Sequence, residues 1–177
     1  LPQKPLSIRF NSRYGDAPLN YPLFEGRENE VYHSFQLRNG GNDYNVAYFR
    51  DGLSVALAKG NMDLDYQEYQ PCVVILNGTF HGIYEMRERI DEFYVAANHF
   101  VHQGNLDMLE DSLVVDQGDS KNYESLLQSI RTLDMTSDSA YQVLDATIDI
   151  NEYINYIIHR VFVGYKIVDF NNRYWRY

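Results

Sequence analysis

Five charged residues occur together at the end of a stretch whose first part is strongly apolar. The stretch runs from Cys72 to Asp91 and reads CVVILNGTFHGIYEMRERID. Its charged residues are Glu85, Arg87, Glu88, Arg89 and Asp91. Charges beside a strand that should be mostly buried require partners, because an unpaired buried charge is costly. Two interpretations are open, namely ion pairs of structural origin and a functional site.

A second polar group lies near the end of the sequence. Asp169, Asn171 and Asn172 follow a long apolar helix that we predict from Asn151 to about Val163, and they precede an alternating strand that begins near Tyr174. Polar residues in a loop between a buried helix and a strand are typical of a functional site. The alternative is a simple turn, because Asp and Asn favour turns in any context.

Other kinds of chemistry find little support in the residue spacing. His99 and His102 are three residues apart, but no carboxylate completes a zinc-type ligand set with them or with His81. No Ser lies in a Gly-x-Ser-x-Gly elbow, so the sequence does not predict a serine hydrolase. Cys72 is the one cysteine, which excludes an intramolecular disulfide framework, and its apolar neighbours predict a buried, inert thiol.

The stretch with the five charges predicts a β-hairpin. Val73 to Leu76 form a β-branched and apolar run, and Asn77-Gly78 is the strongest short signal for a two-residue turn. An alternating pattern resumes from Ile83 to Arg87. The turn therefore brings the charged end of the second strand back beside the start of the first.

Strands dominate the first part of the sequence and helices the second. Before the hairpin we predict strands at Leu6–Phe10 and Val31–Leu37 and a helix at Val46–Lys59 that Gly60 ends. After it, Asp91 predicts a helix start, Leu106–Val115 is a short apolar segment, and further helices begin at Asp119 or Ser120, at Thr136-Ser137-Asp138 and at Asn151, the last of them capped by Asp149 or Asn151. The apolar stripe of the last helix predicts burial in the core. This order predicts an α+β fold, with an antiparallel β-sheet region followed by a mainly helical region.

The composition indicates an acidic globular chain of one domain over residues 1–177. Its 25 acidic and 15 basic residues give a formal net charge of −10, which argues against nucleic-acid binding and against electrostatic attachment to an anionic membrane. No apolar run approaches the roughly 18 residues of a membrane-spanning helix. The sequence begins at Leu1-Pro2 and stops at Tyr177 within a predicted strand, so we expect a piece of a longer protein.

Several stretches together resemble the CotH kinase family, the spore-coat protein H-like atypical protein kinases. The similar stretches are KPLSIRF with YGDAPLNYPLF, LRNGGNDYNVAYFRD, PCVVILNGTFHGIYEMRERID and the tail with Asp169, Asn171 and Asn172. The resemblance covers nearly the whole chain, and the hairpin is its most specific part. It implies a reduced relative of the protein-kinase fold.

The resemblance also implies transfer of a phosphoryl group from ATP, with Mg²⁺, to Ser or Thr of a protein substrate. Asp169 matches the family's catalytic Asp at the end of the long helix, and either Asn171 or Asn172 matches the metal-binding Asn. The interval between Asp and Asn is shorter here than in the family pattern. The family's second magnesium ligand, an Asp after the strand near Tyr174, would follow Tyr177.

Phosphoryl transfer needs a cation on the nucleotide phosphates and a partner that holds the cation. The candidate cation is Lys4, with Glu88 as its partner or Glu85 as the alternative. Arg38 and Arg50 are further candidates, because both flank Gly40-Gly41 and a guanidinium group suits phosphate oxygens. Equally, Arg50 with Asp51 and Arg87 with Glu88 could be surface ion pairs.

The first hypothesis is therefore an extracytoplasmic or cell-surface kinase domain, since relatives of this type occur in bacterial surface and secreted proteins. The second is a catalytically inactive binding or adhesion module of the same fold that contacts glycans or surface proteins through aromatic side chains. The sequence has 16 Tyr and nine Phe, which fits such a surface and equally fits an ordinary β-rich core. A purely structural subdomain is the third possibility.

Overall fold

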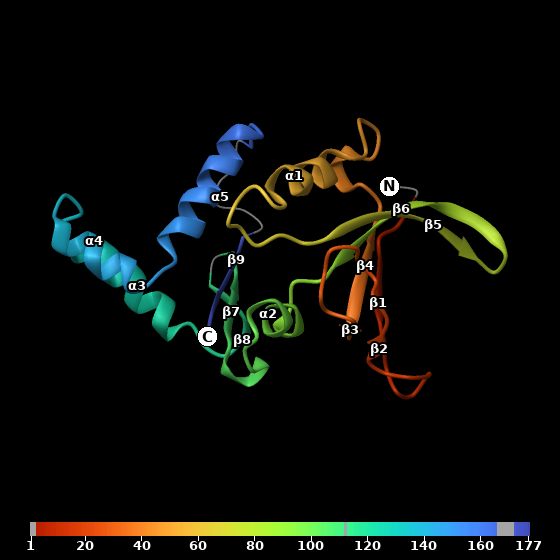
Figure 1. Cartoon of the computed structure of the whole chain (residues 1–177), viewed down its shortest axis with the longest axis horizontal. Coiled ribbons are helices and arrows are strands. Elements are labelled where there is room, and N and C mark those ends of the chain that lie inside the picture. Colours follow the sequence, from red (N-terminus) through yellow and green to blue (C-terminus); the bar gives the residue numbers. More distant parts are fainter. Residues whose placement is uncertain (1–2, 112, 166–171) are drawn as a thin grey trace. The chain divides into compact units, whose positions relative to one another are not determined.

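The computed structural model describes residues 3–111, 113–165 and 172–177. These residues form a mixed α/β structure whose strands all pair in antiparallel fashion (Figure 1). The chain divides into two compact units. Unit 1 consists of Leu1–Asn61 and Tyr66–Phe100, and unit 2 of Met62–Asp65 and Val101–Tyr177. The predicted mixture of antiparallel sheet and helices is confirmed.

Unit 1 is built on a four-stranded sheet with the order β1-β4-β6-β5. Its strands are β1 (Leu6–Arg9), β4 (Ser34–Arg38), β5 (Tyr69–Leu76) and β6 (Thr79–Glu88). A separate pair is formed by β2 (Leu19–Asn20) and β3 (Val31–Tyr32). The predicted hairpin is confirmed as β5 and β6, with Asn77 at φ 50° and Gly78 at φ 79° in the turn. Positive φ at both residues is what a two-residue hairpin turn requires.

Helix α1 (Arg50–Ala58) begins later than the predicted Val46. Tyr48 has φ 67°, outside the helical region, so no continuous helix passes through it. Instead, a 3₁₀ helix, η1 (Gly41–Asp43), comes first, and the Asp43 carboxylate accepts hydrogen bonds from the backbone N–H groups of Ala47 and Arg50. Helical periodicity alone did not indicate that Asp43, which lies in η1, would reach the first turn of α1.

Helix α2 (Glu92–His99) begins where the sequence predicted it. The Asp91 carboxylate accepts hydrogen bonds from the N–H groups of Phe93 and Tyr94 and thereby caps the helix. Ser34 Oγ on β4 donates to the same carboxylate, which ties the cap to the sheet. Phe100 ends the helix in the left-handed conformation and is exposed.

The described residues of unit 2 form a three-stranded sheet and three α-helices. The sheet has the order β8-β7-β9, with β7 (Asp107–Glu110), β8 (Val114–Gln117) and β9 (Arg173–Arg176), and follows a 3₁₀ helix, η2 (Gln103–Asn105). The helices are α3 (Lys121–Thr132), α4 (Asp138–Asp145) and α5 (Ile150–Phe162). Ser137 and Asp149 accept hydrogen bonds from the first turns of α4 and α5, as their positions predicted.

The predicted burial of the last helix is wrong for the part of the chain that the structure describes. No residue of α5 is buried, and Ile154, Ile158, Val161 and Phe162 are exposed. The core of unit 2 lies instead around β7, where Leu106, Met108 and Leu109 are buried. The apolar periodicity identified the helix correctly, but no described element covers that face.

Candidate functional site

The alternation of side chains along β6 distributes its charges over two faces of the sheet. Glu85 and Arg87 lie on one face, whereas Tyr84, Met86 and Glu88 lie on the other, because successive side chains of a strand point in opposite directions. Glu85, Arg87 and Glu88 are all buried. The charged end of the hairpin therefore produces two separate buried charge clusters.

The first cluster, here called the arginine cluster, consists of Arg38, Asp51, Glu85 and Arg87. The Nη1 atom of Arg87 lies 3.1 Å from Asp51 Oδ2, and its Nη2 atom lies 3.3 Å from Glu85 Oε2. Arg38 Nη1 is 3.5 Å from the same Asp51 oxygen. Two guanidinium groups from neighbouring strands thus converge on one carboxylate of helix α1.

Local packing explains why the arginine cluster forms. The β4–β6 register places Arg38 opposite Glu85. Helix α1 lies close to the sheet at Gly52, where a Cβ atom would come within 2.7 Å of the Tyr69 ring. Tyr69 also lies under the Arg87 guanidinium, at 5.4 Å from ring centroid to Cζ. Close approach at Gly52 brings Asp51, the preceding residue in the first turn of α1, to the arginines.

The inner part of the arginine cluster is strongly desolvated. The side chains of Glu85 and Arg87 are each 2% exposed. Burial raises the pKa of Glu85 above its ordinary value, although the Arg87 charge opposes this effect. Glu85 Oε1 and Arg87 Nε have no hydrogen-bond partner within the described residues. Asp51 and Arg38, by contrast, are half-exposed and form the accessible side of the cluster.

The second cluster lies on the opposite face and consists of Arg27, Lys59, Glu68 and Glu88. Arg27 donates to Glu88 through Nε and Nη2, at 3.0 and 2.6 Å, and the N–H of Glu68 donates to the same carboxylate. Lys59 Nζ lies 2.8 Å from Glu68 Oε2. The tyrosine rings of residues 66 and 94 lie within 6 Å of the Arg27 guanidinium, at 4.7 and 5.8 Å. Glu88 is therefore enclosed by structural partners.

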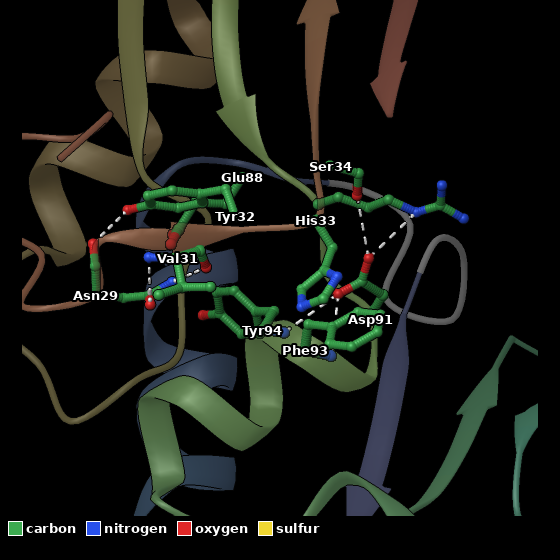
Figure 2. Close-up of a pocket in the computed structure, with 10 residues that line it drawn as sticks. Asn29, Val31, Tyr32, His33, Ser34, Glu88, Asp91, Phe93 and Tyr94 are labelled. Carbon is green, nitrogen blue, oxygen red and sulfur yellow. Dashed lines mark hydrogen bonds and ion pairs between the residues drawn. The ribbon is translucent and has the colours of Figure 1, made fainter. Parts of the chain in front are cut away.

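A small cavity lies beside Glu88, and Figure 2 shows the side chains around it. His33 stacks on Phe93 with ring centroids 3.7 Å apart, and the Asp91 carboxylate accepts a hydrogen bond from the Ser34 hydroxyl. The cavity measures about 20 Å³, room for one water molecule and far too little for a nucleotide. We therefore place the candidate site at the arginine cluster and not at this cavity.

Contrary to the prediction from the sequence, Lys4 is not the ion-pair partner of Glu88 or Glu85. Glu88 pairs with Arg27 and Glu85 with Arg87. Lys4 is exposed, and its backbone carbonyl accepts a hydrogen bond from the Tyr84 hydroxyl. The expected pairing of Lys4 with Glu88 or Glu85 is therefore corrected, because these carboxylates pair with the guanidinium groups of Arg27 and Arg87. A contact of Lys4 with phosphate stays a prediction.

The two suggested surface pairs are also corrected. Arg50 binds Asp43 at 2.6 Å instead of Asp51, because Asp43 reaches the start of α1 from η1. Arg87 pairs with Asp51 and Glu85 and not with Glu88, which lies on the other face of the sheet. Both arginines form ion pairs, but with different carboxylates, and Arg87 is buried instead of lying at the surface.

Of the predicted catalytic loop, Asp169 and Asn171 lie outside the described residues, and Asn172 lies within them. The Asn172 side-chain oxygen accepts a hydrogen bond from the Tyr156 hydroxyl of α5. Its backbone N–H donates to Asp111 Oδ1 at 2.9 Å, and its carbonyl accepts from the Asp111 N–H at 3.0 Å. Asn172 is thus oriented by α5 and by the turn after β7, at the start of strand β9.

Comparison with protein-family models gives a match over residues 1–177 to a family described as CotH kinase protein. The chain belongs to the CotH kinase family. No curated protein and no solved structure matched the chain.

Among the described residues of this CotH domain, no group of three His, Cys, Asp or Glu side chains is placed to hold a metal ion. No described helix is long and apolar enough to span a membrane.

Sequence reasoning missed Asp51 as the acceptor at the centre of the arginine cluster. It also missed Arg27 and Glu68, which enclose Glu88. A signal for Asp51 was present, because it follows Arg50 within the predicted helix Val46–Lys59 and Gly52 permits close approach to a strand. No local signal indicated Arg27, since its partner lies in a distant strand.

Proposed function

We propose that this CotH domain is a protein kinase that transfers a phosphoryl group from Mg-ATP to Ser or Thr hydroxyls of secreted or cell-surface proteins. Family membership over residues 1–177 supports the reaction class. One structural observation supports it most directly, namely the convergence of Arg38 and Arg87 on Asp51. Protein kinases use a strand cation paired with a helix carboxylate to bind nucleotide phosphates, and these three residues have that chemistry.

The residues of the arginine cluster differ in how accessible they are to an anionic ligand. The Arg38 side chain is 40% exposed and can donate to phosphate oxygens from the end of β4. Arg87 is enclosed, so its role is to hold Asp51 in place. Glu85 in turn pairs with Arg87 and would hold it in position. Lys4 and Arg50 remain candidates for further phosphate contacts.

The catalytic steps fall to the loop that contains Asp169. In the proposal, Asp169 orients the Ser or Thr hydroxyl of the substrate and accepts its proton. Asn172, or Asn171, would hold Mg²⁺ through its amide oxygen, which is a ligand type that this ion accepts. Bound Mg-ATP supplies the phosphoryl group. The Tyr156 hydroxyl donates a hydrogen bond to the Asn172 amide oxygen and thereby helps to orient the amide.

Nucleotide binding and labelled phosphate transfer test this proposal separately. Arg38→Met should weaken the affinity for Mg-ATP about tenfold or more, because a charge-assisted hydrogen bond is lost. Arg9→Met is the matched control, since Arg9 is an exposed arginine of the neighbouring strand β1 and should leave the affinity unchanged. Asp169→Asn should retain binding and abolish transfer. Equal effects of Arg38→Met and Arg9→Met, or no binding of Mg-ATP at all, would refute the proposal.

A catalytically inactive binding module is the second candidate. It is favoured by exposed aromatic rings in unit 1, of which Tyr14 is 83% and Phe100 85% exposed. Aromatic faces of this kind bind sugar rings and protein surfaces. A chain that binds no nucleotide but loses affinity for a glycan array or a surface-protein extract on Tyr14→Ala would support this alternative.

A further inference from the structure

Strand β5 forms one edge of the four-stranded sheet of unit 1. Its inner side pairs with β6 along the whole length from Tyr69 to Leu76. Strand β4 pairs with β6 only from Glu85 to Glu88, so the outer part of the hairpin continues beyond the β4 register (Figure 1). The other side of β5 presents backbone N–H and C=O groups at the sheet edge, and such groups template the addition of another strand.

Strand β5 contains a proline, Pro71, and one irregularity of register, but it carries no charged side chain, which is a common protection of an edge strand. Natural edges carry charged side chains, prolines or bulges that prevent pairing. From Cys72 to Leu76 the sequence is CVVIL, without charge or proline. One irregularity of register occurs between Val74 and Ile75. Val73 and Ile75 are 60% and 62% exposed, which is unusual for β-branched residues in a sheet.

The hairpin extends this apolar surface across to β6. Val73 lies opposite Ile83, and Ile75 lies opposite Phe80, so all four side chains share one face. Ile83 and Phe80 are also more than half exposed. The edge of β5 and the adjacent face of the hairpin therefore form one continuous apolar surface, here called the hairpin surface.

The charge distribution identifies the kind of partner that fits the hairpin surface. The chain carries a net charge of −10, so two copies repel each other wherever acidic residues meet. From Pro71 to Tyr84 there is no Asp, Glu, Lys or Arg. Two copies can approach here without like-charge contacts, whereas a basic peptide would find no carboxylate along this edge. Antiparallel pairing of two identical apolar strands is self-complementary, as a two-fold symmetric contact requires.

We propose that two copies of the chain associate through antiparallel pairing of their β5 strands, which joins their sheets into one continuous sheet. The pairing satisfies the outer backbone groups of β5 and covers Val73 and Ile75 of both copies. This inference rests on the edge strand and the charge pattern and does not depend on the proposed kinase activity.

Sedimentation equilibrium of the chain over a range of concentrations tests the association. A reversible dimer is expected, and Val73→Lys with Ile75→Lys should weaken it about tenfold or more, because each like charge enters twice in a symmetric contact. Val114→Lys is the matched control, since Val114 is a 59% exposed strand valine in unit 2, and should leave the dimer intact. Because all three residues are largely exposed, circular dichroism should show an unchanged fold.

Hydrogen exchange of the unmodified chain distinguishes edge pairing from stacking of apolar faces. Backbone amides on the outer side of β5 should become more protected as concentration rises, while amides of β8 should not change. A chain that stays monomeric at all concentrations overturns the proposal. So does a dimer that forms without added protection in β5, or one that the two lysines leave unaffected.

Discussion

Unit 1 buries charged side chains beside aromatic rings, whereas helices α3 and α5 of unit 2 have no buried residue among those described. In unit 1, Glu85, Arg87 and Glu88 are as enclosed as the apolar core residue Tyr84. In unit 2, the buried side chains around β7 are apolar, and the ion pairs of Arg173 with Glu110 and Asp116 are partly exposed.

The two units therefore differ in where their charged side chains lie: unit 1 buries some of them, whereas the ion pairs of Arg173 in unit 2 are partly exposed. Buried ion pairs contribute little net stability, but loss of one partner is severe because the other charge stays buried. The geometry of unit 1 thus depends on keeping its charge clusters complete, and the same clusters supply the candidate phosphate-binding residues. Unit 2 depends on a small apolar centre, and its helices tolerate change on their exposed faces.

The largest expected effect is therefore loss of Arg87. Arg87→Met should lower the free energy of unfolding of unit 1 by about 3–5 kcal/mol, because Glu85 remains buried without its partner. Urea denaturation followed by hydrogen exchange of β5 and β6 measures this effect. The double variant Glu85→Leu with Arg87→Met is the control and should recover most of the loss, since an apolar pair replaces the ion pair. A loss below about 1 kcal/mol in the single variant would show that the cluster is not structurally required.

A smaller effect is expected in the pH dependence of stability through Glu88. Burial raises the pKa of Glu88 above 4.5, with Arg27 opposing this effect. In the folded state the carboxylate therefore takes up a proton at higher pH than in the unfolded state, so its contribution to stability increases as the pH falls and is lost as the pH rises through the folded-state pKa.

The Glu88→Gln variant isolates this contribution. As the pH is lowered from 7 toward 4.5, the wild-type chain should gain stability relative to Glu88→Gln, which cannot titrate at this position. Chemical denaturation of both proteins at several pH values gives the difference. A wild-type chain that instead loses stability relative to the variant would mean that Arg27 outweighs burial and that the folded-state pKa is lowered.

The sequence predicted those elements of both units that have local signals. Asn77-Gly78 identified the hairpin turn, and Asp91, Ser137 and Asp149 marked helix starts whose caps the structure confirms. The β7–β8 hairpin was missed. Its turn has positive φ at Asp111 and Leu113; Asp favours turns, but Leu does not, and no glycine or asparagine lies beside them to mark a hairpin turn.

The charge partners were not predictable in the same way. Arg87 was expected near Glu88 because they are neighbours in sequence, but alternation along a strand places neighbours on opposite faces. Its true partner Asp51 is fixed by the packing of α1 at Gly52. The burial of α5 was overestimated because periodicity reports which side chains share a face and not whether another element covers it. Asp169 and Asn171 remain predictions from the family resemblance.

The smallest expected effect concerns two valines, one in a helix of each unit. Val95 in α2 of unit 1 is 0% exposed, and Val161 in α5 of unit 2 is 75% exposed. Val95→Ala should cost about 2 kcal/mol, from two lost methylene equivalents and the cavity left behind. Val161→Ala should change the free energy of unfolding by less than about 0.5 kcal/mol, because exposed substitutions remove few contacts and Ala favours the helix. Thermal or urea unfolding of the two variants measures the two losses of free energy, and the substitution is the same, Val to Ala, in both helices. A loss at Val161 as large as that at Val95 would mean that the apolar face of α5 is covered in solution, and the contrast between the units would then disappear.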